Sequence, residues 1–219
     1  MRRLLILPFL VGCFSLNFLI ELPQSAQFEL NEFEGSVSQI QKVMELDQER
    51  GLAHNKVNQI MDRFNPDMSS ELKNDIADVI YEMSIKYPNL DVDLICATIT
   101  HESGRVWEPK AVSNAGAMGL MQLMPKTARW LSKYEEITWT NSEEILFNPI
   151  NNIRLGCRYL SALIETYDLE GGLAAYNGGE RIARKWLANN KAEGILWDET
   201  TQYIPYILKL YDEFKSATM

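Results

Sequence analysis

Apolar residues recur at helical spacing along most of this chain, and this pattern constrains the fold more than any other feature. The longest case follows the helix-start pair Asn148-Pro149, and its apolar face is Ile153, Gly156, Cys157, Leu160, Leu163, Ile164 and Tyr167. Seven or more such helices and almost no strand pattern predict a mainly α fold. Any β structure is expected to be a small hairpin within residues 104–119, where glycines and a proline supply turns.

Three glycines punctuate the long helical pattern. Gly156 lies in mid-helix and is expected to mark a close approach of another helix, since glycine costs ~1 kcal/mol there relative to alanine. Gly171-Gly172 is expected to end this helix and to separate it from a short one that contains Tyr176.

The segment around Glu102 carries the first candidate for chemistry. Its helix is predicted from four apolar residues on one face, Val92, Ile95, Cys96 and Ile99. Asp91 suits the N-cap and Gly104 suits a left-handed C-terminal position, so Glu102 falls in the last turn. The negative end of the helix dipole and nearby apolar surface should raise its pKa, as a general acid requires. On spacing alone, an exposed glutamate at a frayed helix end is the alternative.

The first residues have the pattern of an export segment. A basic start, Met1-Arg2-Arg3, precedes an almost continuously apolar run over residues 4–20. Three outcomes stay open: a signal peptide cleaved after Ala26, a lipid on Cys13 within the lipobox-like Leu10-Val11-Gly12-Cys13, and a retained membrane anchor. All three place the remainder outside the cytoplasm, in the cell envelope or periplasm.

Charge and composition argue against several classes of partner. The net charge of −9 at pH 7 argues against nucleic acid, because phosphate binding needs clustered Lys and Arg. Histidines and cysteines are too few and too badly spaced for a zinc site. No metal or cofactor is expected for the function to which the motifs described below point. Cys96 and Cys157 are expected to be separate buried thiols, with a disulfide as the alternative in an oxidising compartment.

A polar stretch over residues 27–35 is expected to be a linker. Two short helices are predicted after it, over residues 36–50 and 52–64, before Asn65-Pro66 breaks the pattern. The predicted organisation is therefore an export segment or anchor over residues 1–26, a linker with short helices over 27–68, and a catalytic domain over 69–219.

Four separated blocks, of which the segment at Glu102 is the first, stand in a fixed order along the predicted domain. They are Glu102-Ser103, then Ser113-x-x-Gly116-Ala117-x-Gly119-Leu120-Met121-Gln122-x-Met124-Pro125, then Ala175-Tyr176-Asn177, and finally Glu199-Thr200-x-x-Tyr203-Ile204. In order and spacing they resemble the lytic transglycosylases of the soluble (SLT) type, which share a lysozyme-like fold with goose-type lysozyme. The helix that begins Asn148-Pro149-x-x-Asn152-Ile153 matches too. The resemblance covers roughly residues 69–214.

The resemblance implies cleavage of the MurNAc–GlcNAc β-1,4 bond of peptidoglycan with formation of a 1,6-anhydro ring, so the enzyme would be a lyase. Two-carboxylate glycosidases place a second acid across the sugar, but the blocks offer none near Glu102 apart from Glu199. With one acid, the 2-acetamido oxygen of MurNAc would attack its own anomeric carbon. Glu102 would first protonate the leaving oxygen and then deprotonate the C6 hydroxyl.

The resemblance also implies contacts with substrate. Ser113 and Gln122 are expected to hydrogen-bond the acetamido group and the sugar hydroxyls. Met124 and Met121 are expected to form an apolar wall, although Met118, Met121 and Met124 at helical spacing would also suit core packing.

Five further residues complete the expected site. Tyr176 is expected to orient the acetamido group or Glu102, and Asn177 to contact a sugar. Ser103 is expected to hold the helix end or the glutamate. Glu199 and Tyr203 are expected to support the same wall, and a purely structural role fits them equally well. His101 points ~100° away from Glu102 around the helix, so no catalytic role is assigned to it.

Two rival functions remain open. A hydrolytic muramidase on the same fold would leave reducing MurNAc ends, and a peptidoglycan-binding module would cleave nothing. The expected partner in each case is a peptidoglycan glycan strand, with possible membrane attachment through the N-terminus.

Overall fold

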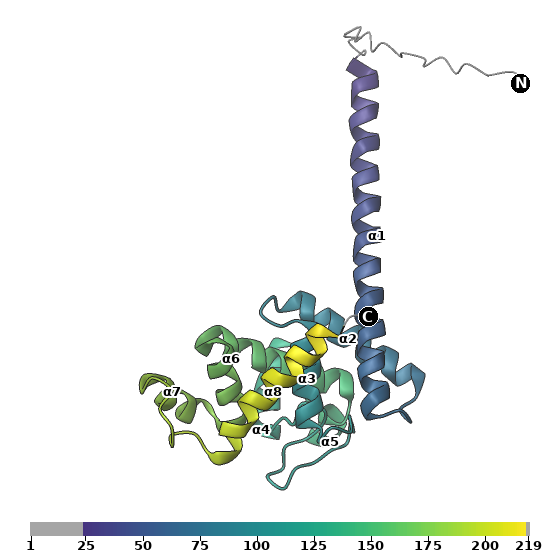
Figure 1. Cartoon of the computed structure of the whole chain (residues 1–219). Coiled ribbons are helices and arrows are strands. Elements are labelled where there is room, and N and C mark those ends of the chain that lie inside the picture. Colours follow the sequence, from purple (N-terminus) through teal and green to yellow (C-terminus); the bar gives the residue numbers. More distant parts are fainter. Residues whose placement is uncertain (1–23, 218–219) are drawn as a thin grey trace, which may run out of the picture. The chain divides into compact units, whose positions relative to one another are not determined.

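The computed structural model describes the backbone of residues 24–217 and the side chains of residues 32–217 (Figure 1). The predicted signal peptide, the lipobox with Cys13 and the anchor fall on residues that lie almost entirely outside this range. The described chain divides into two units at Leu46/Asp47, and each is considered by itself.

The N-terminal helix α1 (Gln24–Phe64) is continuous. The prediction of a linker over residues 27–35 and two short helices is therefore wrong. No proline occurs between Gln24 and Phe64, and the two glycines, Gly35 and Gly51, each cost only ~1 kcal/mol in a helix interior. That cost is too small to interrupt a helix of 41 residues.

The part of α1 up to Leu46 belongs to the first unit. Its large apolar side chains are exposed from residue 32 on: Phe33, Val37, Ile40, Val43, Met44 and Leu46. No helix within the described range is both long and apolar enough to cross a membrane.

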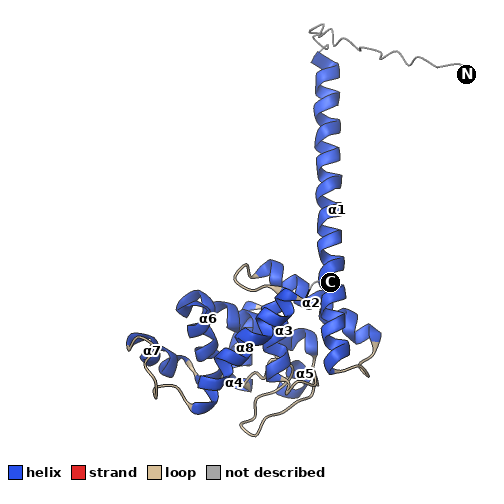
Figure 2. Ribbon diagram, in the orientation of Figure 1, coloured by secondary structure: helices blue, strands red, loops and turns tan. Residues whose placement is uncertain are grey.

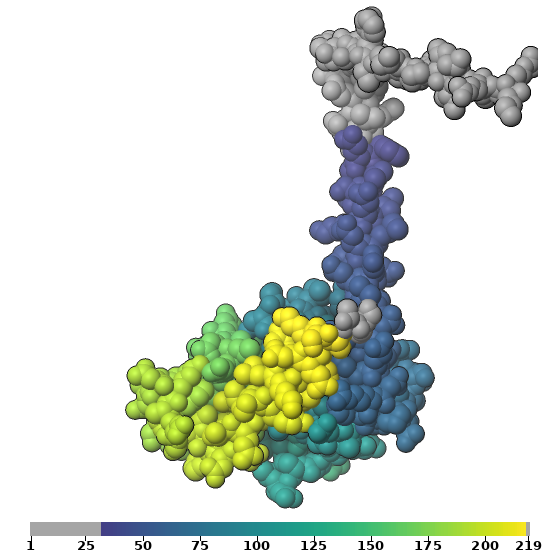
Figure 3. All heavy atoms as spheres, in the orientation of Figure 1, coloured from purple at the N-terminus to yellow at the C-terminus, as the bar shows by residue number. Residues whose placement is uncertain are grey.

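The second unit, from Asp47 onward, is built around helix α3 (Val92–Glu102). Seven consecutive residues of α3 are buried, from Leu94 to Thr100. The helix is therefore buried on all sides, whereas the sequence pattern predicted burial of one apolar face only. Helix α8 (Asp198–Ser216) packs along α3, and α2 (Ser70–Lys86) packs on it as well. Figure 3 shows α8 lying across the viewed face of this unit.

Helix α6 (Pro149–Gly178) contacts α2, α8 and the short helix α7 (Glu180–Ala188). A second, smaller core forms where α4 (Pro125–Leu131) and α5 (Ser142–Leu146) pack against α6, and a 3₁₀ turn at Ser132–Tyr134 packs on α4. Helices and loops account for the described chain, as Figure 2 shows. The expected hairpin is reduced to two isolated antiparallel bridges, Val112 with Met118 and Met118 with Leu123. The mainly α prediction is confirmed.

The break in α6 lies at Asp168 and not at Gly171-Gly172 as expected. Asp168 has φ 62° and ψ −177°, and its carboxylate accepts a hydrogen bond of 2.9 Å from the amide of Gly171. It therefore caps the second helical segment as an N-cap residue does. Both glycines are buried inside that segment. Gly172 packs closely on the preceding segment, since a Cβ at this position would lie 2.8 Å from the backbone of Ile164.

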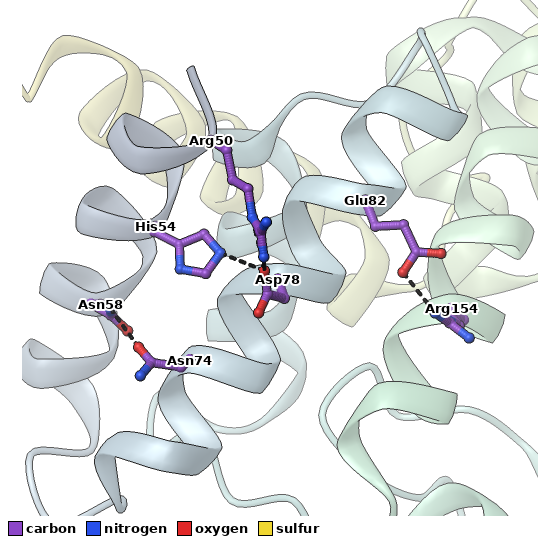
Figure 4. Close-up of polar contacts among 7 residues, drawn as sticks. All are labelled: Arg50, His54, Asn58, Asn74, Asp78, Glu82 and Arg154. Carbon is purple, nitrogen blue, oxygen red and sulfur yellow. Dashed lines mark hydrogen bonds and ion pairs between the residues drawn. The ribbon is translucent and has the colours of Figure 1, made fainter. Parts of the chain in front are cut away.

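The C-terminal half of α1 is part of the second unit. Val57, Ile60 and Met61 enter its core. Polar contacts complete the packing on α2: Arg50 and His54 both point to the carboxylate of Asp78, with His54 Nε2 2.9 Å from Oδ1 (Figure 4). The compact unit thus begins before residue 69, where the catalytic domain was predicted to start.

Candidate active site

Glu102 is the last residue of α3, and the helix begins and ends as the sequence predicts. Asp91 Oδ1 accepts a hydrogen bond of 2.8 Å from the amide of Leu94. Gly104 is left-handed, with φ +67°, and its amide donates to the carbonyl of His101. The helix end therefore holds Glu102 at a fixed position beside the buried core.

The loop after Glu102 is anchored by a buried tryptophan. Arg105 and Trp107 both have positive φ, a strained conformation for residues other than glycine. Trp107 is fully buried, and its Nε1 donates to Thr100 Oγ1 at 3.0 Å. Its amide donates to Ser103 Oγ at 3.1 Å, and Ser103 is only 3% exposed. Ser103 was expected to hold either the helix end or the glutamate. Its contact with the amide of Trp107 matches the first of these roles.

The carboxyl of Glu102 is half-buried and has an altered acidity. Burial raises its pKa from the ordinary 4.5 to about 7, and the negative charge of Glu199 acts in the same direction. A hydrogen bond of 2.7 Å from the hydroxyl of Tyr203 to Oε1 opposes this rise, because it stabilises the carboxylate. The group therefore exchanges its proton near neutral pH, in agreement with the sequence expectation.

Two tyrosines accompany Glu102. Tyr203 is 1% exposed, and burial together with the charge of Glu102 raises its pKa well above the ordinary value. Burial and, to a smaller extent, the charge of Glu102 also raise the pKa of Tyr176. Both phenols therefore remain protonated donors. The hydroxyl of Tyr176 donates to the carbonyl of Met121 at 2.8 Å, which ties it to the loop that carries Gln122.

That loop is held by Asn152, a buried residue of α6. Its Oδ1 accepts from the amide of Met121 at 2.7 Å, and its Nδ2 donates to the carbonyls of Met118 and Leu146 at 2.9 and 3.0 Å. Gly156 does mark a close approach, but of this loop and not of a helix: a Cβ there would lie 2.3 Å from Met121 Sδ.

Of the methionines proposed for an apolar wall, only one is at the surface. Met121 is fully buried and Met118 is 8% exposed, so both belong to the core. Met124 is 45% exposed. For Met121 the core-packing alternative is therefore the one observed.

Gln122 has φ 46°, a strained conformation that often accompanies functional positions. Its Nε2 donates to the carbonyls of Ala111 and Gly119 at 3.2 and 2.9 Å. These bonds use both amide hydrogens, so Oε1 is the side-chain atom left for a ligand. Ser113 lies in the same loop, where its Oγ accepts from the amide of Ala117 at 3.0 Å.

The last two blocks of the resemblance meet in space. Thr200 Oγ1 donates to Asn177 Oδ1 at 2.6 Å, which joins the end of α6 to the start of α8. Glu199 is exposed, yet its charge acts on both Glu102 and His101. The structure thus brings Glu102, Tyr176, Tyr203 and Glu199 together.

Sequence reasoning gave no role to Asn152 or Trp107 and dismissed His101. A signal existed for Asn152, a polar residue in the helix block that resembles the family. Within the described residues, no three His, Cys, Asp or Glu side chains gather as a metal site. Cys96 and Cys157 are free and buried.

A helical domain with a single glutamate of raised pKa at the end of a buried helix is typical of the lysozyme-like class. A family model described as "Transglycosylase SLT domain" matches residues 80–196, more than half of the chain. The chain belongs to this family.

Curated relatives include the soluble lytic murein transglycosylase of Escherichia coli, 35% identical over 118 residues, which cover 49% of this chain and 18% of that protein. Another is the membrane-bound lytic murein transglycosylase C of Photorhabdus laumondii, 39% identical over 123 residues, which cover 52% of this chain and 34% of that protein. The chain thus spans about a third or less of the length of these relatives.

Two solved structures are similar. The 70 kDa soluble lytic transglycosylase of Escherichia coli matches with a TM-score of 0.55 and 31% identity, over 63% of this chain and 23% of that one. An inactive mutant of the lytic transglycosylase Slt from Pseudomonas aeruginosa matches with a TM-score of 0.55 and 29% identity, over 63% and 23%. The expected transglycosylase fold is confirmed.

Proposed function

We propose that this chain is a peptidoglycan lytic transglycosylase that cleaves the MurNAc–GlcNAc β-1,4 bond and forms 1,6-anhydro-MurNAc. The observation that carries the proposal is Glu102, a half-buried carboxyl whose pKa is raised to about 7 and which accepts a hydrogen bond from Tyr203. One group can act as acid and then as base only when its pKa lies near the working pH.

In the first step, the protonated Glu102 gives its proton to the glycosidic oxygen as the bond to the anomeric carbon breaks. The 2-acetamido oxygen of MurNAc attacks that carbon and forms an oxazolinium ring. In the second step, the Glu102 carboxylate takes the proton of the C6 hydroxyl. The C6 oxygen then attacks the anomeric carbon, opens the oxazolinium ring and closes the anhydro ring.

The neighbouring residues support these steps. Tyr203 holds the orientation of the Glu102 carboxyl. Tyr176, whose pKa is raised by burial and by the charge of Glu102, orients the acetamido group. Gln122 presents its Oε1 to a hydroxyl or N–H of the sugar, with Ser113 in the same loop. Met124 offers exposed apolar surface to a sugar ring, and Asn177 contacts a sugar from the end of α6. Ser103 holds the end of the helix that carries the acid, and the charge of Glu199 raises the pKa of Glu102.

A single-acid reaction fits better than a two-carboxylate reaction. The acid whose charge reaches Glu102 is Glu199, which is exposed and raises the pKa of Glu102. A carboxylate that served as nucleophile would need to lie across the sugar at a defined distance from the acid. The names of the relatives, soluble and membrane-bound lytic murein transglycosylases, also favour the lyase.

The substrate sets the location. We propose that the chain acts at the cell envelope on peptidoglycan glycan strands, with its catalytic domain within residues 69–219. Attachment through the N-terminus, by an anchor or through Cys13, stays a prediction.

The test is digestion of purified sacculi with the full chain, followed by mass spectrometry of the soluble muropeptides. Products lighter by one water than hydrolytic fragments are expected. Hydrated fragments would instead identify a muramidase, and binding without release would identify a non-catalytic module.

Glu102→Gln is the decisive variant. It is expected to abolish release while glycan binding and the circular dichroism spectrum persist. Glu165→Gln, at an exposed position of α6, is the matched control and should digest sacculi at the wild-type rate. Retained activity in Glu102→Gln would refute the assignment.

A further inference from the structure

The residue before the acid, His101, lies in the contact between α3 and α8. Its ring meets that of Tyr203 edge-on, with centroids 4.7 Å apart and an angle of 81° between the planes. It meets Tyr206, one turn further along α8, at 5.1 Å and 66°. His101 therefore lies against the tyrosine that donates to Glu102.

We propose that His101 is a positioning residue: its ring holds the ring of Tyr203 so that the Tyr203 hydroxyl points at Oε1 of Glu102. Its importance for turnover rests on the proposed function, whereas the positioning itself does not. Neither the family match nor the sequence pattern assigns this role to His101.

The geometry supports this role because a phenol has a single hydrogen to donate. Whether it reaches Glu102 depends on the tilt of the whole tyrosine ring. Edge-to-face contact is the arrangement that aromatic rings prefer, and it fixes that tilt. Truncation of His101 would leave space on that side of Tyr203, and the ring could turn away from the carboxyl.

Chemistry at the imidazole agrees with a packing role. His101 Nδ1 is buried and has no hydrogen-bond partner among the described residues. Burial lowers the pKa of His101, although the charge of Glu199 opposes this, so the ring is neutral at neutral pH. Tyr203 and Tyr206 are the aromatic residues that face it from α8. A neutral His101 ring has no charge that could shift the pKa of Glu102 directly. Its influence on Glu102 is exerted through its packing against Tyr203.

The decisive measurement is the pKa of Glu102 itself, read by carbon-13 NMR of the side-chain carboxyl in the full chain and assigned with Glu102→Gln. Tyr203→Phe provides the reference: the pKa of Glu102 is expected to rise by about one pH unit in this variant, because a hydrogen bond to the carboxylate is lost. His101→Ala is expected to produce at least half of that rise. His101→Phe keeps an aromatic ring and is expected to retain the wild-type value.

Either of two results would overturn the proposal. One is an unchanged pKa of Glu102 in His101→Ala with a native circular dichroism spectrum. The other is a rise in His101→Phe as large as that in His101→Ala. If His101→Ala does not fold, His101→Leu, which fills much of the volume without a ring, is read by the same criteria.

Kinetics on soluble glycan chains separates this proposal from the proposed function. His101→Ala is expected to lower kcat roughly fivefold to tenfold with KM near the wild-type value, since the ring positions the acid and does not contact substrate. A wild-type chain that cleaves nothing would refute the proposed function, while the titration would still judge the role of His101. A raised KM with unchanged kcat would contradict positioning.

Discussion

The hydroxyl of Tyr203 donates a hydrogen bond of 2.7 Å to Oε1 of Glu102, although the two residues are 101 positions apart in the chain. The bond joins the C-terminal end of α3 to the N-terminal part of α8. The orientation of the acid is therefore decided by the packing of two helices, and several measurable consequences follow from this region.

Activity should fall as the pH rises above about 7. The first step needs Glu102 protonated, and its pKa is raised to about 7 by burial. We expect kcat/KM to lose about tenfold per pH unit on the alkaline side of that value. A pH–rate profile on soluble glycan chains checks this, and an alkaline limb near 4.5 would show an acid exposed to water.

Glu102→Gln should stabilise the fold at neutral and alkaline pH. The unfolded carboxyl ionises near 4.5 and the folded one near 7, so the folded state binds more protons between these values. Wild-type stability therefore falls as the pH rises through this window, by about 3 kcal/mol at most. The gain of the variant should be near zero at pH 4 and fully present at pH 8, as measured by urea denaturation. An equal gain at both pH values would contradict the raised pKa.

Gly156→Ala should destabilise the second unit. The new Cβ would lie 2.3 Å from Met121 Sδ and 2.7 Å from Met121 Cβ. We expect a loss of about 1–3 kcal/mol in the free energy of unfolding. Activity should also fall, because Met121 accepts the hydrogen bond from Tyr176 and precedes Gln122.

Gly51→Ala is the matched control for that variant. Gly51 also lies inside a helix, but nothing is within 4 Å of its added Cβ. We expect a gain of about 0.5–1 kcal/mol and unchanged activity. Chemical denaturation of both variants separates the steric effect at Gly156 from helix propensity; equal effects would show that Met121 does not restrict that site.

Asn152→Ala should cost about 2–4 kcal/mol and most of the activity. The side chain pairs with three backbone groups of the loop and α5. Its removal leaves the amide of Met121 and the carbonyl of Leu146 without this partner, whereas the carbonyl of Met118 keeps its bond from the amide of Leu123. Asn189→Ala, which removes one exposed bond to Lys185, should change the thermal midpoint little. Thermal unfolding and sacculus digestion of the two variants provide the measurements, and a similar midpoint for both would argue against the loop anchor.

Local signals were reliable wherever one residue determines one feature of the backbone. The Asp91 cap, the left-handed Gly104 and the helix starts at Pro125 and Pro149 all followed from neighbouring residues. The raised pKa of Glu102 was also expected, but its cause is burial in the tertiary structure. Glycine signals were misleading when taken as breaks, because Gly51, Gly171 and Gly172 lie inside helices.

The sequence by itself determined that the chain is helical, that it carries the blocks of a transglycosylase domain, and that Glu102 ends its helix, because caps, turns and periodicity act over a few residues. Tertiary structure decided the rest. It put Met121 in the core, made Asn152 the anchor of a loop, and set His101 against Tyr203. The physical reason is that these relationships join residues from different helices, and packing, unlike a cap or a turn, has no signature in the local sequence.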